Sequence, residues 1–397
     1  MNTVSRASSE VRFLTLLLLL WLAGTALRLT ILAVPPVIPL IHDELHLNAT
    51  QIGILTGLPS MLFAFAAVPG SLLIARLGIR TALVVGLALT ALGGALRGAL
   101  PDVGWLYSMT IAMGAGVAIM QVTMPTTVRA WLPHRIGFAT AVYTNGLLIG
   151  EIIPVALMIP LVLPLAGGSW QWGFVVWSAP VAMIAIIVML LAPRQTAANG
   201  SMPARLRWWP DWRNTLIWRL GIMLGTINAT YFATNAFIPD YMRHTGQSEW
   251  ISAVLSGLNA GQLPASFLLL AVAGRMERKA WPYVICGLLC VLATGGIVFG
   301  IGVWIVAAAT LQGFAAAAIL ILALALPPLL SPPGDVHRVS AAMFTISYSC
   351  AVIVPVISGL AWDLTGVASA AFLPIALCGV LLVILAPAIN HVPRVGS

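Results

Sequence analysis

Twelve apolar stretches follow one another along this chain, and each is close to the length that crosses a lipid bilayer. They cover approximately residues 13–41, 51–75, 81–100, 104–128, 137–164 and 171–192, and then 215–239, 250–273, 281–301, 303–330, 339–362 and 368–389. A bilayer core about 30 Å thick needs roughly 20 apolar residues for each helical crossing. We therefore expect an all-α membrane protein with twelve transmembrane helices.

The composition also favours a chain surrounded by lipid. Of the 397 residues, 60% are hydrophobic and only 8% are charged, whereas soluble domains carry about 25% charged residues. The mean hydropathy is +1.01. Too few polar side chains remain to cover a surface that faces water.

A polar, basic segment divides the twelve stretches into two sets of six. It contains Arg194, Arg205, Arg207 and Arg213. We expect residues 1–193 to form an N-terminal six-helix bundle, residues 194–214 a cytoplasmic linker, and residues 215–397 a C-terminal six-helix bundle. The N-terminus resembles a signal peptide, but its apolar run continues past Arg28 to Ile41, so we expect a retained first helix.

The distribution of basic residues predicts the orientation. With both termini placed inside, fifteen of the 19 Lys and Arg residues fall in cytoplasmic segments: Arg6, Arg12, Arg76, Arg80, Arg129, Arg135, the four linker arginines, Arg275, Arg278, Lys279, Arg338 and Arg394. The opposite side holds Arg97 and Arg243. This is the pattern of the positive-inside rule, and it predicts a multi-pass protein of the bacterial inner membrane with cytoplasmic termini. The rule also explains the net charge of +8 without a nucleic-acid partner.

The two halves resemble each other in sequence. Residues 54–58 (Ile-Leu-Thr-Gly-Leu) match residues 254–258 (Val-Leu-Ser-Gly-Leu), and Pro39 matches Pro239 at the same offset of 200. Because each half has six helices, both halves begin on the same side of the membrane. Such a parallel repeat predicts two pseudo-symmetric bundles around a central cleft.

Two ionisable residues stand near the middle of a predicted span, Arg28 in the first and Glu151 in the fifth. Charged groups inside a bilayer are costly and are candidate functional residues by default. The planar fork of Arg28 suits a carboxylate, a nitro group or another compact oxyanion. If proton binding by Glu151 depends on whether Arg28 is engaged elsewhere, the two residues couple proton binding to substrate binding. The alternative is a permanent ion pair that only joins two helices.

Further polar residues in the predicted spans are candidates for substrate binding. Asn228 stands at offset 200 from Arg28, and Asn235 follows it by two turns. Each of the others could equally form a hydrogen bond between helices; they are Gln121, Asn145, Asn259, Gln262, Gln312 and Tyr348. Pro35, Pro36 and Pro39 prevent a regular helix near the end of the first span, which we interpret as a gating bend.

Signatures of enzymes and of bound cofactors are missing from the sequence. It contains no P-loop, HExxH or GxSxG motif. The four cysteines lie inside apolar stretches without the spacing of a metal site or a disulfide framework. We expect no enzyme activity, no cofactor and no metal.

The loop between the second and third stretches resembles that of the major facilitator superfamily. In this family the loop usually reads G-x-L-a-D-R-x-G-R-R, and residues 71–80 read Ser-Leu-Leu-Ile-Ala-Arg-Leu-Gly-Ile-Arg. Arg76, Gly78 and Arg80 match, while Ser71 and Ala75 replace the glycine and the aspartate. The resemblance implies a gating loop at Arg76, Gly78 and Arg80, in a fold of twelve helices.

Within the superfamily, the chain resembles the branch of cyanate permeases and nitroimidazole transporters. The first helix of that branch tends to read L-R-P-x-x-x-x-x-x-P-x-x-P-x-I. Here Leu27 and Arg28 are followed by Pro36, Pro39 and Ile41, and Leu29 replaces the proline after the arginine. The resemblance implies that Arg28 binds substrate.

We therefore expect a secondary transporter that moves a small anionic or nitro-bearing solute by alternating access, with proton coupling through Glu151. Its expected partners are the solute, protons and the lipid bilayer, and we expect a monomer. The alternative is a proton-driven efflux pump for hydrophobic or cationic compounds, against which the central arginine argues. A pore would favour rings of charge, and a receptor would need an extramembrane module.

Overall fold

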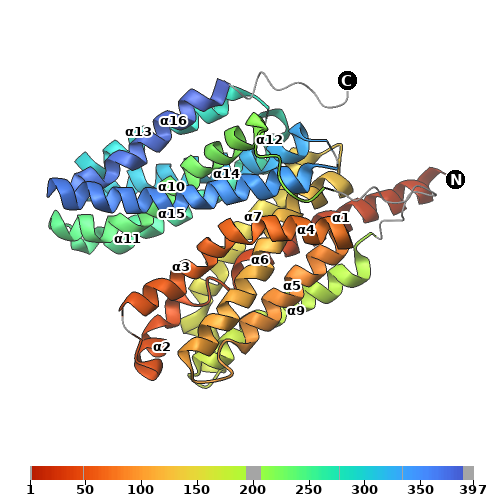
Figure 1. Ribbon diagram of the computed structural model, residues 1–397, viewed down its shortest axis with the longest axis horizontal. Coiled ribbons are helices and arrows are strands. Elements are labelled where there is room, and N and C mark those ends of the chain that lie inside the picture. The colour runs from red at the N-terminus through yellow and green to blue at the C-terminus, as the bar shows by residue number, and fades with distance from the viewer. Residues whose placement is uncertain (1, 48, 194–206, 277, 333, 388–397) are drawn as a thin grey trace. The chain divides into compact units, whose positions relative to one another are not determined.

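The computed structural model describes residues 2–47, 49–193, 207–276, 278–332 and 334–387, and all regular secondary structure in these ranges is helical (Figure 1). The chain forms two compact units. The first lies within residues 1–134, 142–210 and 333–341, and the second within residues 135–141, 211–332 and 342–397. Arg194, Arg205 and Arg394 lie outside the described residues.

The first unit is built mainly from the elements before the linker. These are α1 (Asn2–Leu29), η1 (Pro35–Val37), α2 (Ile38–Leu45), α3 (Ala49–Phe65), α4 (Ala67–Leu77), α5 (Ile79–Leu96), α6 (Val103–Trp131), α7 (Ile136–Leu157), η2 (Met158–Val162), α8 (Leu163–Leu165) and α9 (Trp170–Leu191). The first residues of α7, up to Ala141, belong to the second unit.

The second unit is built mainly from the elements after the linker. These are α10 (Thr215–His244), η3 (Ser248–Trp250), α11 (Ile251–Ala260), α12 (Gln262–Met276), α13 (Ala280–Phe299), α14 (Val303–Leu330), α15 (Val336–Thr365), η4 (Ala368–Phe372) and α16 (Leu373–Leu385). The first residues of α15, up to Ala341, belong to the first unit.

Side-chain caps fix the first residue of three long helices. Asp102 accepts a hydrogen bond from the Trp105 amide at 2.7 Å at the start of α6. Ser169 and Asn214 cap α9 and α10 in the same way. Such caps satisfy amides that have no partner within the helix, so each predicted span begins at a defined residue.

The all-α membrane fold expected from the sequence is confirmed. Among the described residues, ten helical segments are long and apolar enough to cross a membrane, and the bent pair α3–α4 supplies an eleventh. The remaining predicted span, residues 215–239, lies in α10, which has 30 residues but is not among these segments. Its asparagines and threonines lower its hydropathy, so α10 needs other helices to shield its polar face from lipid.

The expected position of Arg28 near the middle of the first span is wrong. Residues 13–41 are interrupted, as the three prolines predict, but α1 already ends at Leu29, and the chain resumes helical turns only at η1 and α2. Arg28 therefore lies in the last turn of α1 and not halfway along a helix. Pro35, Pro36 and Pro39 lack the amide hydrogens that a continuing helix requires, which accounts for part of this interruption.

Glycines bring α1 and α7 into backbone contact within the first unit. A β-carbon at Gly24 would collide with the carbonyl oxygen of Tyr143. At Gly146 and Gly150 it would collide with the carbonyl oxygens of Trp21 and Thr25. Small residues permit this close approach of helices in membrane proteins, and it places the end of α1 beside the middle of α7.

Substituting Gly146 by alanine should therefore destabilise the protein. The added methyl group forces α1 away from α7, and overpacking of this kind costs about 1–3 kcal/mol. We expect a lower apparent Tm for Gly146→Ala in detergent.

Gly295→Ala in α13 is the matched control, because no atom lies within 4 Å of the position its β-carbon would take. Alanine is also the better helix former, so this variant should keep or raise the Tm. Equal Tm values for the two variants would contradict the close contact of α1 with α7.

Candidate functional site

The structure brings together the two charged residues that the sequence places inside the spans. Arg28 Nε of α1 lies 3.0 Å from Glu151 Oε1 of α7. The exposed fractions of the two side chains are 11% for Arg28 and 20% for Glu151. The pair is thus mostly enclosed, and a small part of each side chain remains accessible.

The backbone contact of α1 with α7 positions this pair. Trp21 packs on Gly146 and Thr25 packs on Gly150, and the next turn of α1 carries Arg28 alongside Glu151. The C-terminal end of a helix carries partial negative charge, and this favours a cation in the last turn of α1.

Two further contacts surround the ion pair. The Trp21 indole donates a hydrogen bond to Asn145 Oδ1 at 3.0 Å, which joins the same two helices. The guanidinium carbon of Arg28 lies 5.4 Å from the ring centroid of Phe63 in α3, within the range of a cation–π interaction. Gln121 of α6 is buried in the same unit. The sequence did not single out Trp21 or Phe63.

The second unit carries the counterpart of this arrangement. Asn228 of α10 donates a hydrogen bond to Ser347 Oγ of α15 at 2.8 Å. One turn earlier, a β-carbon at Gly225 would lie 2.8 Å from Cys350 Sγ, so these helices also approach closely. The position at offset 200 from Arg28 therefore joins the equivalent pair of helices through a neutral hydrogen bond.

Other predicted residues of the second unit hold its helices together. Gln312 donates to Thr234 Oγ1 at 2.6 Å, and the hydroxyl of Tyr231 donates to Asn259 Oδ1 at 2.5 Å. Asn235 donates to the carbonyl oxygen of Tyr231 in its own helix.

Two more predicted residues lie in the interior of this unit. Gln262 of α12 is buried. The buried ring of Tyr348 stacks on Phe344, with the ring centroids 6.3 Å apart. The structure therefore places Asn228 and Tyr348 in contacts within the second unit, Asn235 in a hydrogen bond within α10, and Gln262 in the interior.

The predicted gating loop connects α4 to α5. Gly78 has a φ of 80°, a conformation that side chains with a β-carbon rarely adopt. Arg80 donates a hydrogen bond to the carbonyl oxygen of Met189 in α9, and Arg76 is exposed. The structure therefore places Arg80, but not Arg76, in a contact between helices.

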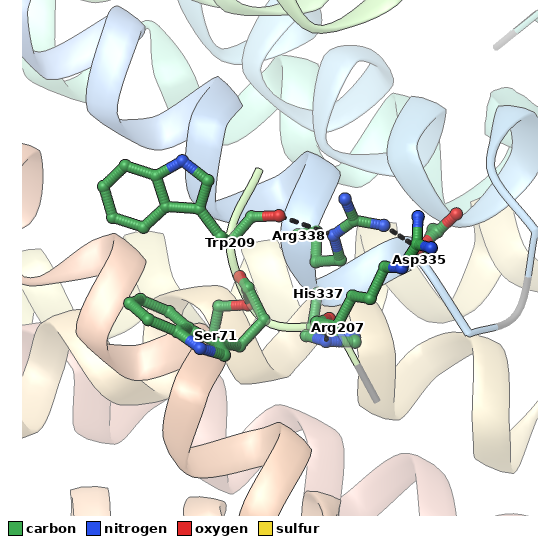
Figure 2. Close-up of polar contacts among 7 residues, drawn as sticks. Ser71, Arg207, Trp209, Asp335, His337 and Arg338 are labelled. Atoms are coloured by element: carbon green, nitrogen blue, oxygen red, sulfur yellow. Dashed lines mark hydrogen bonds and ion pairs between the residues drawn. The ribbon is translucent and has the colours of Figure 1, made fainter. Parts of the chain in front are cut away.

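The described end of the linker lies against α4 and the first turn of α15 (Figure 2). Three successive carbonyl oxygens of this segment each contact a different side chain. Trp208 O accepts from Ser71 Oγ at 2.9 Å, Trp209 O accepts from Arg338 Nε at 2.8 Å, and Arg207 O lies 3.1 Å from His337 Nε2. Arg338 also pairs with Asp335 at 2.5 Å. We call residues 207–209 the linker strap.

Arg97 is the residue whose surroundings differ most from expectation. The charge distribution placed it at the outer end of the third predicted span, on the side opposite the cytoplasm, but its side chain is fully buried. Its guanidinium carbon lies 4.2 Å from the ring centroid of Phe174 in α9, and Nη2 donates to the carbonyl oxygen of Thr30 at 2.6 Å. An arginine stays charged even when it is buried.

Comparisons with known proteins agree with this architecture. The chain is 25% identical over 385 residues to the 2-nitroimidazole transporter of Escherichia coli (strain K12), covering 96% of this chain and 97% of that protein. It is 24% identical over 268 residues to the cyanate transport protein CynX of the same organism, covering 66% and 68%. Among solved structures, the proton:xylose symporter XylE superposes with a TM-score of 0.75 at 13% identity, covering 97% of both chains.

The sequence profile of the Major Facilitator Superfamily matches residues 20–300, well over half of the chain. The resemblance seen in residues 71–80 and in the first span is thereby confirmed, and so is a multi-pass membrane protein. The chain belongs to the Major Facilitator Superfamily of membrane transporters.

Proposed function

We propose that this protein is a proton-coupled secondary transporter that moves a small anionic or nitro-bearing solute by alternating access. The observation that carries the proposal is the ion pair of Arg28 with Glu151, which is mostly enclosed and yet partly accessible. The fixed cation can bind an anionic solute, and the carboxyl group beside it can take up a proton. A proton-coupled transporter of anions needs both.

The coupling follows from competition for Arg28. Arginine stays charged and binds flat oxyanions through two parallel hydrogen bonds. A solute that takes this place removes the counter-charge of Glu151, and an enclosed carboxylate without a cation binds a proton more readily. Solute and proton would then be carried together.

The substrate class rests on Arg28 and on the relatives. Two relatives are named as transporters of 2-nitroimidazole and of cyanate. Both solutes are small and present a negative or partly negative group to a guanidinium. Gln121 and Asn145 in the first unit, and Asn228, Asn235, Gln262 and Tyr348 in the second, would supply further polar contacts to the solute.

The gate on the linker side would combine the predicted loop with the linker strap. The family's loop carries an aspartate where this chain has Ala75, so Arg76, Gly78 and Arg80 lack that carboxylate. Ser71 stands where the family has glycine, and its hydroxyl binds the strap. We infer that the strap, which contacts both α4 and the start of α15, contributes to closing the linker side in this chain.

We further propose a monomer in the bacterial inner membrane with both termini in the cytoplasm. The positive-inside distribution of Arg and Lys supports this orientation. The rival function is proton-driven efflux of hydrophobic or cationic compounds. A central guanidinium repels cations. The charge of the ligands that bind therefore distinguishes anion transport from efflux of cations.

Small anions and nitroheterocycles should stabilise the purified protein, and Arg28→Gln should abolish this effect. A ligand present at 100 times its Kd raises the unfolding free energy by about 2.7 kcal/mol, which appears as a higher Tm. Cyanate, nitrite and 2-nitroimidazole are the probes, with a lipophilic cation for comparison.

The double variant Arg28→Gln/Glu151→Gln is the control for folding, because it removes both charges and leaves neither unpaired. Anion stabilisation that survives Arg28→Gln would exclude the anion site. Stabilisation only by the lipophilic cation would favour efflux.

Glu151→Gln should separate solute movement from the proton gradient. Gln keeps the size of the side chain but cannot carry a proton, so solute exchange across proteoliposomes should persist while accumulation driven by a pH gradient is lost. Radiolabelled solute that accumulates in Glu151→Gln as in the unaltered protein would show that Glu151 does not carry the coupling.

Ser71→Ala should loosen the linker strap. A typical hydrogen bond contributes about 1 kcal/mol, so amide hydrogen exchange over residues 207–210 should become about fivefold faster. Ser108→Ala is the matched control, since that exposed hydroxyl binds only its own helix at Gly104. Unchanged exchange over residues 207–210 in Ser71→Ala would mean that Ser71 does not hold the strap.

A further inference from the structure

Arg97 binds the end of α1 at the position where that helix is interrupted. Arg97 follows the last residue of α5, and its Nη2 donates to Thr30 O at 2.6 Å. Its Nε lies 3.4 Å from Gly94 O in its own helix. The guanidinium thus reaches the C-terminal carbonyl groups of two helices, and the last carbonyls of a helix have no partner within it.

The charge of Arg97 is balanced without a carboxylate. No described acidic residue forms an ion pair with it, and Nη1 has no hydrogen-bond partner. Its surroundings are the Phe174 ring at 4.2 Å and the ends of α1 and α5. Helix C-termini carry partial negative charge and aromatic faces attract cations, so these groups replace an acidic partner.

The prolines alone do not explain why α1 ends at Leu29. Pro35 and Pro36 lack the amides that would bind the carbonyl oxygens of Ile31 and Leu32 in a continuing helix. In a continuing helix Thr30 O would accept a hydrogen bond from the amide of Val34, and Val34, unlike proline, has that amide hydrogen. In the structure the Val34 amide donates to Ile31 O at 3.3 Å, and Thr30 O accepts a hydrogen bond from Arg97 Nη2. Arg97 thus occupies the acceptor that a further turn of helix would use.

The end of α1 also determines where Arg28 points. Arg28 O accepts the amides of Ile31 and Leu32 at 3.1 and 3.0 Å, so the residue belongs to the turn that closes the helix. Thr30, held by Arg97, is only two residues away. A change in this turn would move Arg28 relative to Glu151 and Phe63, both of which it contacts.

We propose that Arg97 is a positioning residue of the transport site: it holds α1 in its interrupted form and thereby aims Arg28 at the solute. This inference rests on the proposed function of Arg28. Arg97 itself needs no contact with the solute, because it acts through the main chain at Thr30.

A double-substitution cycle on cyanate binding tests this inference. Arg97→Gln should weaken binding about tenfold in the unaltered protein but less than twofold in an Arg28→Lys background, since residues that act through one another are not additive. Arg97→Lys, which keeps the charge, should restore part of the affinity. Arg243→Gln removes an exposed arginine from an ion pair with Asp240 and should leave binding unchanged. An equal loss in both backgrounds, or no loss, would overturn the inference.

Amide hydrogen exchange over residues 30–34 gives a second test that needs no ligand. Arg97→Gln and Arg97→Lys should both accelerate exchange in this segment, about tenfold for Arg97→Gln, while Arg243→Gln leaves it unchanged. Unchanged exchange in both Arg97 variants would refute the role of Arg97 in the interruption of α1. If the unaltered protein binds no anion but the exchange responds as expected, the proposed function fails and the role of Arg97 at α1 stands.

Discussion

The contact of Arg28 with Glu151 is the interaction on which the first unit depends. Taking two charges out of water costs several kcal/mol for each ion, and only close geometry repays it. Here the geometry comes from the glycines between α1 and α7, which let the two backbones touch one turn before the charged pair. The two side chains remain 11% and 20% exposed, and the proposed exchange of partners at Arg28 relies on this accessible part.

Both units use this arrangement of helices but with different chemistry. In the first unit the pair of helices is joined by an ion pair, and in the second Asn228 and Ser347 replace it with a neutral hydrogen bond. A second ion pair would add another desolvation cost. Charge is thus concentrated where α1 is interrupted, and Arg97 binds the free carbonyl of Thr30 at that interruption.

The fold was predictable from the sequence because every helix that crosses lipid must be about 20 residues long and mostly apolar. Length and apolar composition define ten of the spans and the bent pair α3–α4, whereas α10, predicted from the apolar stretch at residues 215–239, carries more polar residues. Arg28 and Glu151 were recognisable as charges inside spans, but their contact depends on Gly146 and Gly150, whose role appears only when the helices are packed. Arg97 lies near the end of the third predicted span, where a charged residue is expected to reach water, so nothing in the sequence indicated its burial. The strap was not predictable, since main-chain carbonyls leave no signature in a sequence.

Proton uptake on anion binding tests the central claim most directly. If solute and Glu151 compete for Arg28, adding cyanate to the purified protein in weakly buffered solution should draw up to one proton per bound anion from the medium. The same titration of Glu151→Gln should bind cyanate without a proton change. Binding without proton uptake in the unaltered protein, or equal uptake in Glu151→Gln, would contradict the account.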